Sequence, residues 1–142
     1  MADTEKIEKV EDLAVYQAFF DLALEVEKAT RGCAPDFRWL RGQSLRSSES
    51  VCANLTEGFY SQYSTEYLQA LYRCRREARE TMTHLRYAMK VGQLSDTIGA
   101  QMLGGYTEAV KQLAKLIASI ERKIQERGKS KGGTGDPHHT DH

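Results

Sequence analysis

Three arginines, Arg75, Arg79 and Arg86, have a spacing that places their side chains on one side of a helix. At about 100° per residue, Arg79 and Arg86 lie within about 40° of Arg75, and Lys90 follows one turn later. Cations aligned in this way can neutralise phosphates. Each such contact adds about 0.9 to the magnitude of the slope of log affinity against log salt concentration for duplex nucleic acid. Arg75, Arg79, Arg86 and Lys90 are therefore the candidate nucleic-acid-binding residues. The alternative is that their stems shield the apolar stripe of the same helix.

A line of polar residues runs along the segment before Gly58. It follows spacings of 3, 4, 4 and 3 and comprises Gln43, Arg46, Ser50, Asn54 and Glu57. Serine and asparagine compete with a helix for its backbone hydrogen bonds and are poor choices for a surface that only meets water. The line is either a solvated face or a contact with another helix. That helix could belong to the same chain or to a neighbouring subunit.

Residue patterns that carry catalysis are missing from the sequence. Glu80 and His84 are four residues apart, but there is no HExxH, no ExxH pair and no P-loop. The Glu80–His84 spacing favours a charge pair within one helix or a subunit contact. The expectation is a non-enzymatic protein without a metal or cofactor, and a metal-dependent enzyme is the weakest alternative. His138, His139 and His142, near the end of the chain, are assigned no function.

Composition limits the class of protein. The 142 residues are enough for one domain, and their formal net charge is zero. That sum hides an acidic first segment, residues 1–36, and a basic segment, residues 59–92. The net charge therefore does not favour nucleic-acid binding, but a local basic face could still provide it. The three cysteines form no CxxC pair and no signal peptide begins the chain, which predicts a cytoplasmic setting. No apolar run reaches the ~20 residues needed to cross a membrane.

Apolar residues recur every three or four positions between the two prolines, Pro35 and Pro137, which predicts an all-α protein. The first helix is expected from about Val10 to Gly32, where the glycine would take a left-handed cap conformation. Three more are expected over 37–60, 64–92 and 95–127. Short connections favour an up-down-up-down antiparallel four-helix bundle over residues 10–127. Residues 1–9 are predicted to be a flexible N-terminus and residues 128–142 a disordered tail.

Each of the first two helices has an apolar side that should face the core. On the first helix we expect it to comprise Leu13, Tyr16, Phe20 and Leu24. On the second we expect Leu45, Cys52, Leu55 and Phe59, with Val51 at the edge. Cys52 and Cys74 are expected to be packing residues.

The segment QSLRSSESVCANLTEG, which carries the polar line and ends at Gly58, is followed by the aromatic Phe59. It resembles the signature of the four-helix-bundle proteins encoded in intervening sequences of bacterial 23S ribosomal RNA genes. The resemblance covers roughly residues 10–95 and includes Glu80. It implies a compact bundle that assembles into a ring, commonly a homopentamer, with no established enzymatic activity. The chain is also similar in architecture to the accessory proteins of diversity-generating retroelements, which bind a reverse transcriptase and its template RNA.

Two functional hypotheses follow. The first is a non-enzymatic oligomeric helical bundle that binds structured RNA or DNA, or a nucleic-acid-associated protein. The alternative is a scaffold or accessory subunit of a reverse transcriptase that acts mainly through protein contacts, as the neutral total charge would allow. In either case the helix-contact or subunit-interface motif consists of Gln43, Arg46, Ser50, Asn54, Glu57, Gly58 and Glu80.

Overall fold

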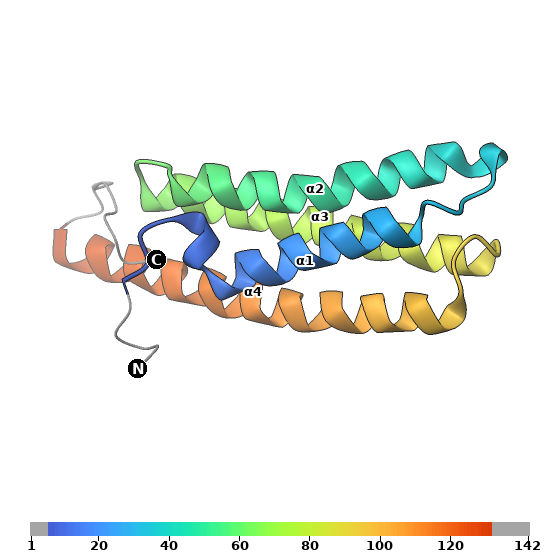
Figure 1. Cartoon of the computed structure of the whole chain (residues 1–142). Coiled ribbons are helices and arrows are strands. Elements are labelled where there is room, and N and C mark those ends of the chain that lie inside the picture. Colours follow the sequence, from blue (N-terminus) through green and yellow to red (C-terminus); the bar gives the residue numbers. More distant parts are fainter. Residues whose placement is uncertain (1–5, 132–142) are drawn as a thin grey trace.

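The computed structural model of the chain describes residues 6–131, which form four α-helices and no strand. The helices are α1 (Ala14–Ala29), α2 (Arg38–Phe59), α3 (Ser64–Lys90) and α4 (Asp96–Lys131). Two short 3₁₀ turns, η2 (Val10–Asp12) and η3 (Pro35–Phe37), precede α1 and α2. Successive helices run in opposite directions and lie side by side (Figure 1). The predicted all-α class with four helices is confirmed, and the order along the chain is up-down-up-down.

The turns between helices use caps that differ in part from the prediction. Gly92 ends α3 with φ of 76°, a left-handed conformation that suits glycine. Ser95 accepts a hydrogen bond at 3.2 Å from the backbone N–H of Ile98 and so caps α4. The expectation of a left-handed cap at Gly32 was wrong, because Gly92 is the only glycine with positive φ among the described residues.

The ends of the bundle also shift from their expected positions. The first helix is split, because η2 closes around Asp12, whose carboxylate accepts hydrogen bonds at 3.2 Å from the N–H groups of Glu8 and Lys9. At the other end, α4 continues to Lys131, four residues beyond the expected limit near 127. Residues 1–5 and 132–142, which include the three tail histidines, lie outside the described residues.

The core side of α1 was placed wrongly by the sequence. Leu13, just before the helix, is buried as expected, but Phe20 and Leu24 are 44% and 47% exposed and Tyr16 is only partly buried. The buried side of α1 is instead made by Val15, Phe19, Leu22 and Val26. Apolar residues occupy more than half of the circumference of α1, so two stripes share the helical period. Phe19 of the buried stripe meets Tyr106 of α4, whereas the other stripe lines a groove between α1 and α2.

The core side of α2 was predicted only in part. Cys52, Leu55 and Phe59 are buried as expected, Val51 is fully buried rather than at an edge, and Leu45 is only partly buried. Buried serines complete this side. Ser44 donates a 2.8 Å hydrogen bond to the Leu40 carbonyl, and Ser47 lies 2.7 Å from the Thr81 hydroxyl. A serine that satisfies its hydroxyl on the helix can be buried cheaply, so its polarity misleads a pattern based on hydropathy.

Aromatic rings contribute to the core of the bundle. Phe19 of α1 and Tyr106 of α4 lie 6.1 Å apart between ring centroids, and Phe59 of α2 lies 6.5 Å from Tyr67 of α3. One pair joins α1 to α4 and the other joins α2 to α3, and all four rings belong to one hydrophobic core. Within residues 6–131, no helix is both long and apolar enough to span a bilayer.

Candidate functional site

The predicted polar line on α2 meets α3 of its own chain. Arg46 pairs with Glu80 and lies 3.7 Å from the carboxylate of Glu77. His84 is one turn from Glu80, and its Nε2 lies 3.3 Å from the same carboxylate. The expected pair between Glu80 and His84 is therefore present, within a larger cluster centred on Arg46. Gln43 sits at the edge of this cluster, where its side-chain oxygen accepts from Arg46 at 3.4 Å.

A second cluster lies further along the same seam. Arg73 donates from Nε to the Asn54 side-chain oxygen at 2.9 Å and from Nη2 to the Glu57 carboxylate at 3.0 Å. The Asn54 amide donates in turn to the Ser50 carbonyl at 2.9 Å and lies 3.1 Å from the Ser50 hydroxyl. Asparagine, which can accept and donate at once, thus joins an arginine of α3 to the backbone of α2.

Gly58 permits the close approach that this seam requires. A Cβ at Gly58 would lie 2.6 Å from the Cβ of Ala70 and 3.0 Å from the Tyr67 ring. At that distance a larger residue would force the two helices apart. Arg46, Asn54, Glu57 and Gly58 therefore contact α3 within one chain, while Gln43 and Ser50 bond to Arg46 and Asn54 of α2, so the line is not a purely solvated face.

The candidate basic residues lie along the side of α3 that borders α4. Arg79 and Arg86 line a cleft of about 460 Å³ together with Lys111 of α4, and Met82 and Val110 also line it. Arg79 and Arg86 are exposed and form no ion pair with any described residue. The structure thus brings two predicted arginines together and adds Lys111, which the sequence did not indicate because it comes from a different helix.

The two remaining candidates occupy the ends of this basic side. Arg75 lies over the ring of Tyr72, 5.3 Å from its centroid, in a cation–π contact. The Tyr72 hydroxyl donates at 2.6 Å to the carboxylate of Glu121, and this hydrogen bond is the main cause that raises the pKa of Tyr72. Lys90 is exposed in the last turn of α3. Arg75 is therefore partly engaged within the bundle, while Lys90 is open to solvent.

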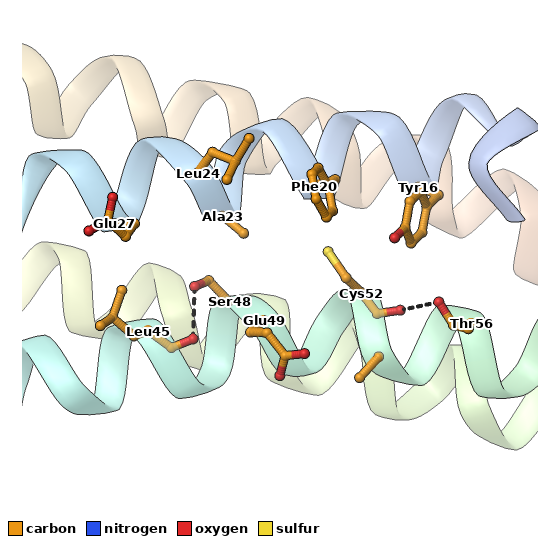
Figure 2. Close-up of a pocket in the computed structure, with 11 residues that line it drawn as sticks. Tyr16, Phe20, Ala23, Leu24, Glu27, Leu45, Ser48, Glu49, Cys52 and Thr56 are labelled. Atoms are coloured by element: carbon orange, nitrogen blue, oxygen red, sulfur yellow. Dashed lines mark hydrogen bonds between the residues drawn. The ribbon is translucent and has the colours of Figure 1, made fainter.

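An apolar groove on the other side of the bundle was not foreseen. It lies between α1 and α2 and has a volume of about 400 Å³. Tyr16 and Phe20 of α1 stack with centroids 5.7 Å apart and face Cys52 of α2 across the groove (Figure 2). Leu24 continues the same line along α1. These are the side chains that the sequence assigned to the core, so the missed signal was a second apolar stripe on α1.

Carboxylates mark the rim of the groove, at Glu27 and Glu49. A hydrogen bond from the Arg31 guanidinium, aided by its charge and that of Arg41, lowers the pKa of Glu27. Burial, followed by the nearby charge of Glu49, raises the pKa of the Cys52 thiol to about 12. The thiol is therefore protonated near neutral pH, a form that is a poor nucleophile.

Cys74 is also buried in the core, and burial raises the pKa of its thiol. It donates to the Val51 carbonyl at 3.4 Å, so its environment is that of a packing residue, as predicted. In the part of the chain that the structure describes, no group of three or more histidine, cysteine, aspartate or glutamate side chains is placed to hold a metal ion.

The fold and the α2–α3 seam define a class, that of four-helix-bundle proteins whose second and third helices are joined by a polar motif. Within that class, the family model described as 23S rRNA-intervening sequence protein matches residues 11–115. The chain belongs to this family, which confirms the resemblance seen in its sequence, and the match extends further toward the C-terminus than residue 95. No curated protein matches the chain.

A solved structure has the same fold. It is the crystal structure of a protein of unknown function from the S23 ribosomal protein family of Bacteroides thetaiotaomicron. The two superpose with a TM-score of 0.68 and 21% identity, over 73% of this chain and 98% of that chain. At this level of identity the likeness establishes the shared fold.

Proposed function

We propose that this protein is a non-enzymatic, homo-oligomeric module that binds structured RNA, and that the cleft between α3 and α4 makes the contact. The observation that carries the proposal is the exposure of Arg79 and Arg86, without carboxylate partners among the described residues, beside Lys111. Three unpaired cysteines at positions 33, 52 and 74 fit the reducing cytoplasm in which we place the protein.

The charges of this cleft suit a phosphate backbone. Arginine presents a planar fork of donors that matches phosphate oxygens, and a cation without a nearby carboxylate keeps its full attraction for them. Elsewhere on the bundle, Arg31, Arg46 and Arg73 are each engaged by a carboxylate within 3.0 Å. Of the three described cations that line the cleft, Lys111 alone has a carboxylate partner, Glu108, whose oxygen lies 3.3 Å from its ammonium. The zero net charge of the chain therefore coexists with a local surface on which cations outnumber their partners.

Reversing the charge of Arg86 should test this cleft. We expect Arg86→Glu to weaken binding of a structured RNA hairpin and to lower the slope of log affinity against log salt concentration by about 1. Affinity can be measured by fluorescence anisotropy of a labelled hairpin across a salt series. Because the contact is to phosphate, the loss should be similar for hairpins of different sequence.

Lys28→Glu provides the matched control, because it changes the net charge equally on an exposed position of α1, away from the cleft. It should leave both affinity and salt slope close to those of the unchanged protein. Absence of RNA binding at low salt, or equal losses in Arg86→Glu and Lys28→Glu, would contradict the proposed role of the cleft.

We propose that five copies of the chain assemble into a ring. The contact between neighbouring copies would use the groove between α1 and α2. Its apolar side chains recur at helical spacing, with Phe20 44% and Leu24 47% exposed. A line of this kind is suited to receive side chains from the surface of another helix. A second copy of the chain, bound there, would remove this apolar surface from water.

Phe20→Glu should therefore convert the oligomer to a species with the 16.1 kDa mass of one chain. A charged group at the centre of an apolar contact is costly to bury, whereas in the monomer it faces water. Multi-angle light scattering measures the mass, and circular dichroism checks the fold. Ala100→Glu, on the exposed side of α4, is the control and should leave the mass unchanged. An unaltered mass in Phe20→Glu, or a monomeric parent protein, would contradict this assembly.

The same groove favours a second candidate function, that of a scaffold or accessory subunit of a reverse transcriptase. If the chain does not occupy its own groove, Phe20 and Leu24 are open to a helix of a protein partner. A reverse-transcriptase gene adjacent to that of this protein, with binding of the purified enzyme that Phe20→Glu abolishes, would support this alternative. RNA binding lost in Arg86→Glu but retained in Phe20→Glu would favour the first candidate.

A further inference from the structure

Two exposed aromatic rings meet at one end of the α2–α3 seam. Trp39, in the first turn of α2, is 52% exposed, and Tyr87, in the last turn of α3, is 47% exposed. Their ring centroids lie 5.6 Å apart with an angle of 65° between the planes. Trp39 stands four residues before Gln43, so it continues the line of seam residues on α2 and is the only tryptophan of the chain.

The pair differs from the other contacts of the seam. Arg46 and Arg73 join α2 to α3 through paired polar groups, whereas Trp39 and Tyr87 join them through aromatic rings, about half of whose surface is in water. An edge-to-face contact engages the edge of one ring and the face of the other, so it leaves aromatic surface on which a further ring can stack.

Cations neighbour the aromatic pair along both helices. Lys90 lies one turn beyond Tyr87 on the exposed side of α3, and Arg86, which lines the basic cleft, precedes Tyr87 directly. Arg38 is exposed beside Trp39, and the exposed carboxylate of Asp36 is the nearest acidic group in sequence. In the two segments that carry the pair, residues 36–39 and 86–90, three cations stand against one carboxylate, a balance that suits a ligand that combines a flat ring with a negative charge.

We propose that Trp39 and Tyr87 form a stacking platform for an unpaired base of the bound RNA, whose backbone passes Arg86 and Lys90. This inference rests on the proposed RNA binding and specifies its substrate as RNA with single-stranded bases next to a helical segment. Aromatic side chains stack on any base, while a base inside a duplex is already stacked on its neighbours. The platform therefore gives preference for a loop or an overhang, with little preference for sequence.

The experiment uses the fluorescence of Trp39 in the full chain. A hairpin with a single-stranded loop should quench this emission on binding, whereas a blunt duplex of the same stem should bind more weakly and leave the emission nearly unchanged. Tyr87→Leu should lower affinity for the hairpin roughly tenfold and leave affinity for the duplex unaltered. Trp39→Leu should do the same, and Trp39→Phe, which keeps a ring, should retain most of the preference. Unfolding midpoints of the variants exclude loss of fold as the cause.

The outcomes separate this inference from the function on which it rests. If hairpin and duplex bind equally, or if the hairpin binds without quenching Trp39, the platform is wrong and RNA binding by the cleft stands. If neither RNA binds at low salt, the proposed function fails and the platform with it. If Trp39 emission changes with protein concentration alone, together with the mass in light scattering, the pair is a subunit contact and the platform is overturned.

Discussion

Phe19→Ala should lower the free energy of unfolding by about 3–5 kcal/mol, whereas Phe20→Ala should lower it by less than about 1 kcal/mol in the monomer. Phe19 is fully buried against the ring of Tyr106, but its neighbour Phe20 is 44% exposed in the groove between α1 and α2. Truncating Phe19 leaves a cavity that a close-packed core cannot refill. Truncating Phe20 removes a side chain that water already reaches.

Urea unfolding followed by circular dichroism measures the difference between these two variants. Because self-association would add to the stability of the parent protein, both variants should be compared at concentrations where light scattering gives the same mass. Equal losses in Phe19→Ala and Phe20→Ala would show that the assignment of the two stripes of α1 is wrong.

Gly58→Ala should destabilise the bundle by about 1–3 kcal/mol, although alanine is the better helix former. The new Cβ would lie 2.6 Å from the Cβ of Ala70, which cannot rotate away. Gly42→Ala should act in the opposite direction and stabilise the protein by about 0.5–1 kcal/mol. Gly42 is on the same helix and is exposed, and no atom outside its own helix lies within 4 Å of the position that a Cβ would take.

Thermal and urea unfolding of both glycine variants give the sign of each effect. The double variant Gly58→Ala with Ala70→Gly removes the opposing Cβ. After allowance for the cost of a glycine in α3, it should be more stable than Gly58→Ala alone. If Gly58→Ala and Gly42→Ala both stabilise the protein, the close approach of α2 and α3 at Gly58 is not a constraint on the fold.

Much of the fold follows from local signals. The glycine and serine around the α3–α4 turn mark the ends of those helices, and Pro35 marks the start of the segment that leads into α2. Helix ends depend on nearby residues, which the sequence displays directly. The core side of α1 depends instead on which neighbours each stripe meets, so Tyr16, Phe20 and Leu24 fit the helical period as well as the residues that are buried.

The sequence predicts which residues belong to the candidate site better than it predicts how those residues are arranged in space. The line from Gln43 to Glu57 is visible in the sequence, but its partners on α3 depend on how the two helices pack. Trp39 could have been found, because it lies four residues before Gln43 and thus on the same side of α2. Lys111 could not, since it joins Arg79 and Arg86 only through the packing of α4 on α3.

The order in which the helices pack bears on how fast the chain can fold. Four pairs of the described helices pack together. Three of them are consecutive in sequence, namely α1 with α2, α2 with α3, and α3 with α4, whereas the fourth pair, α1 with α4, joins the first helix to the last. Loop-closure entropy is therefore small for three of the four contacts and large for one. Bundles dominated by such local contacts fold on the scale of about microseconds to milliseconds. Docking α1 against α4 is accordingly the step that carries the largest entropic barrier, and it is the step that completes the environment of Phe19.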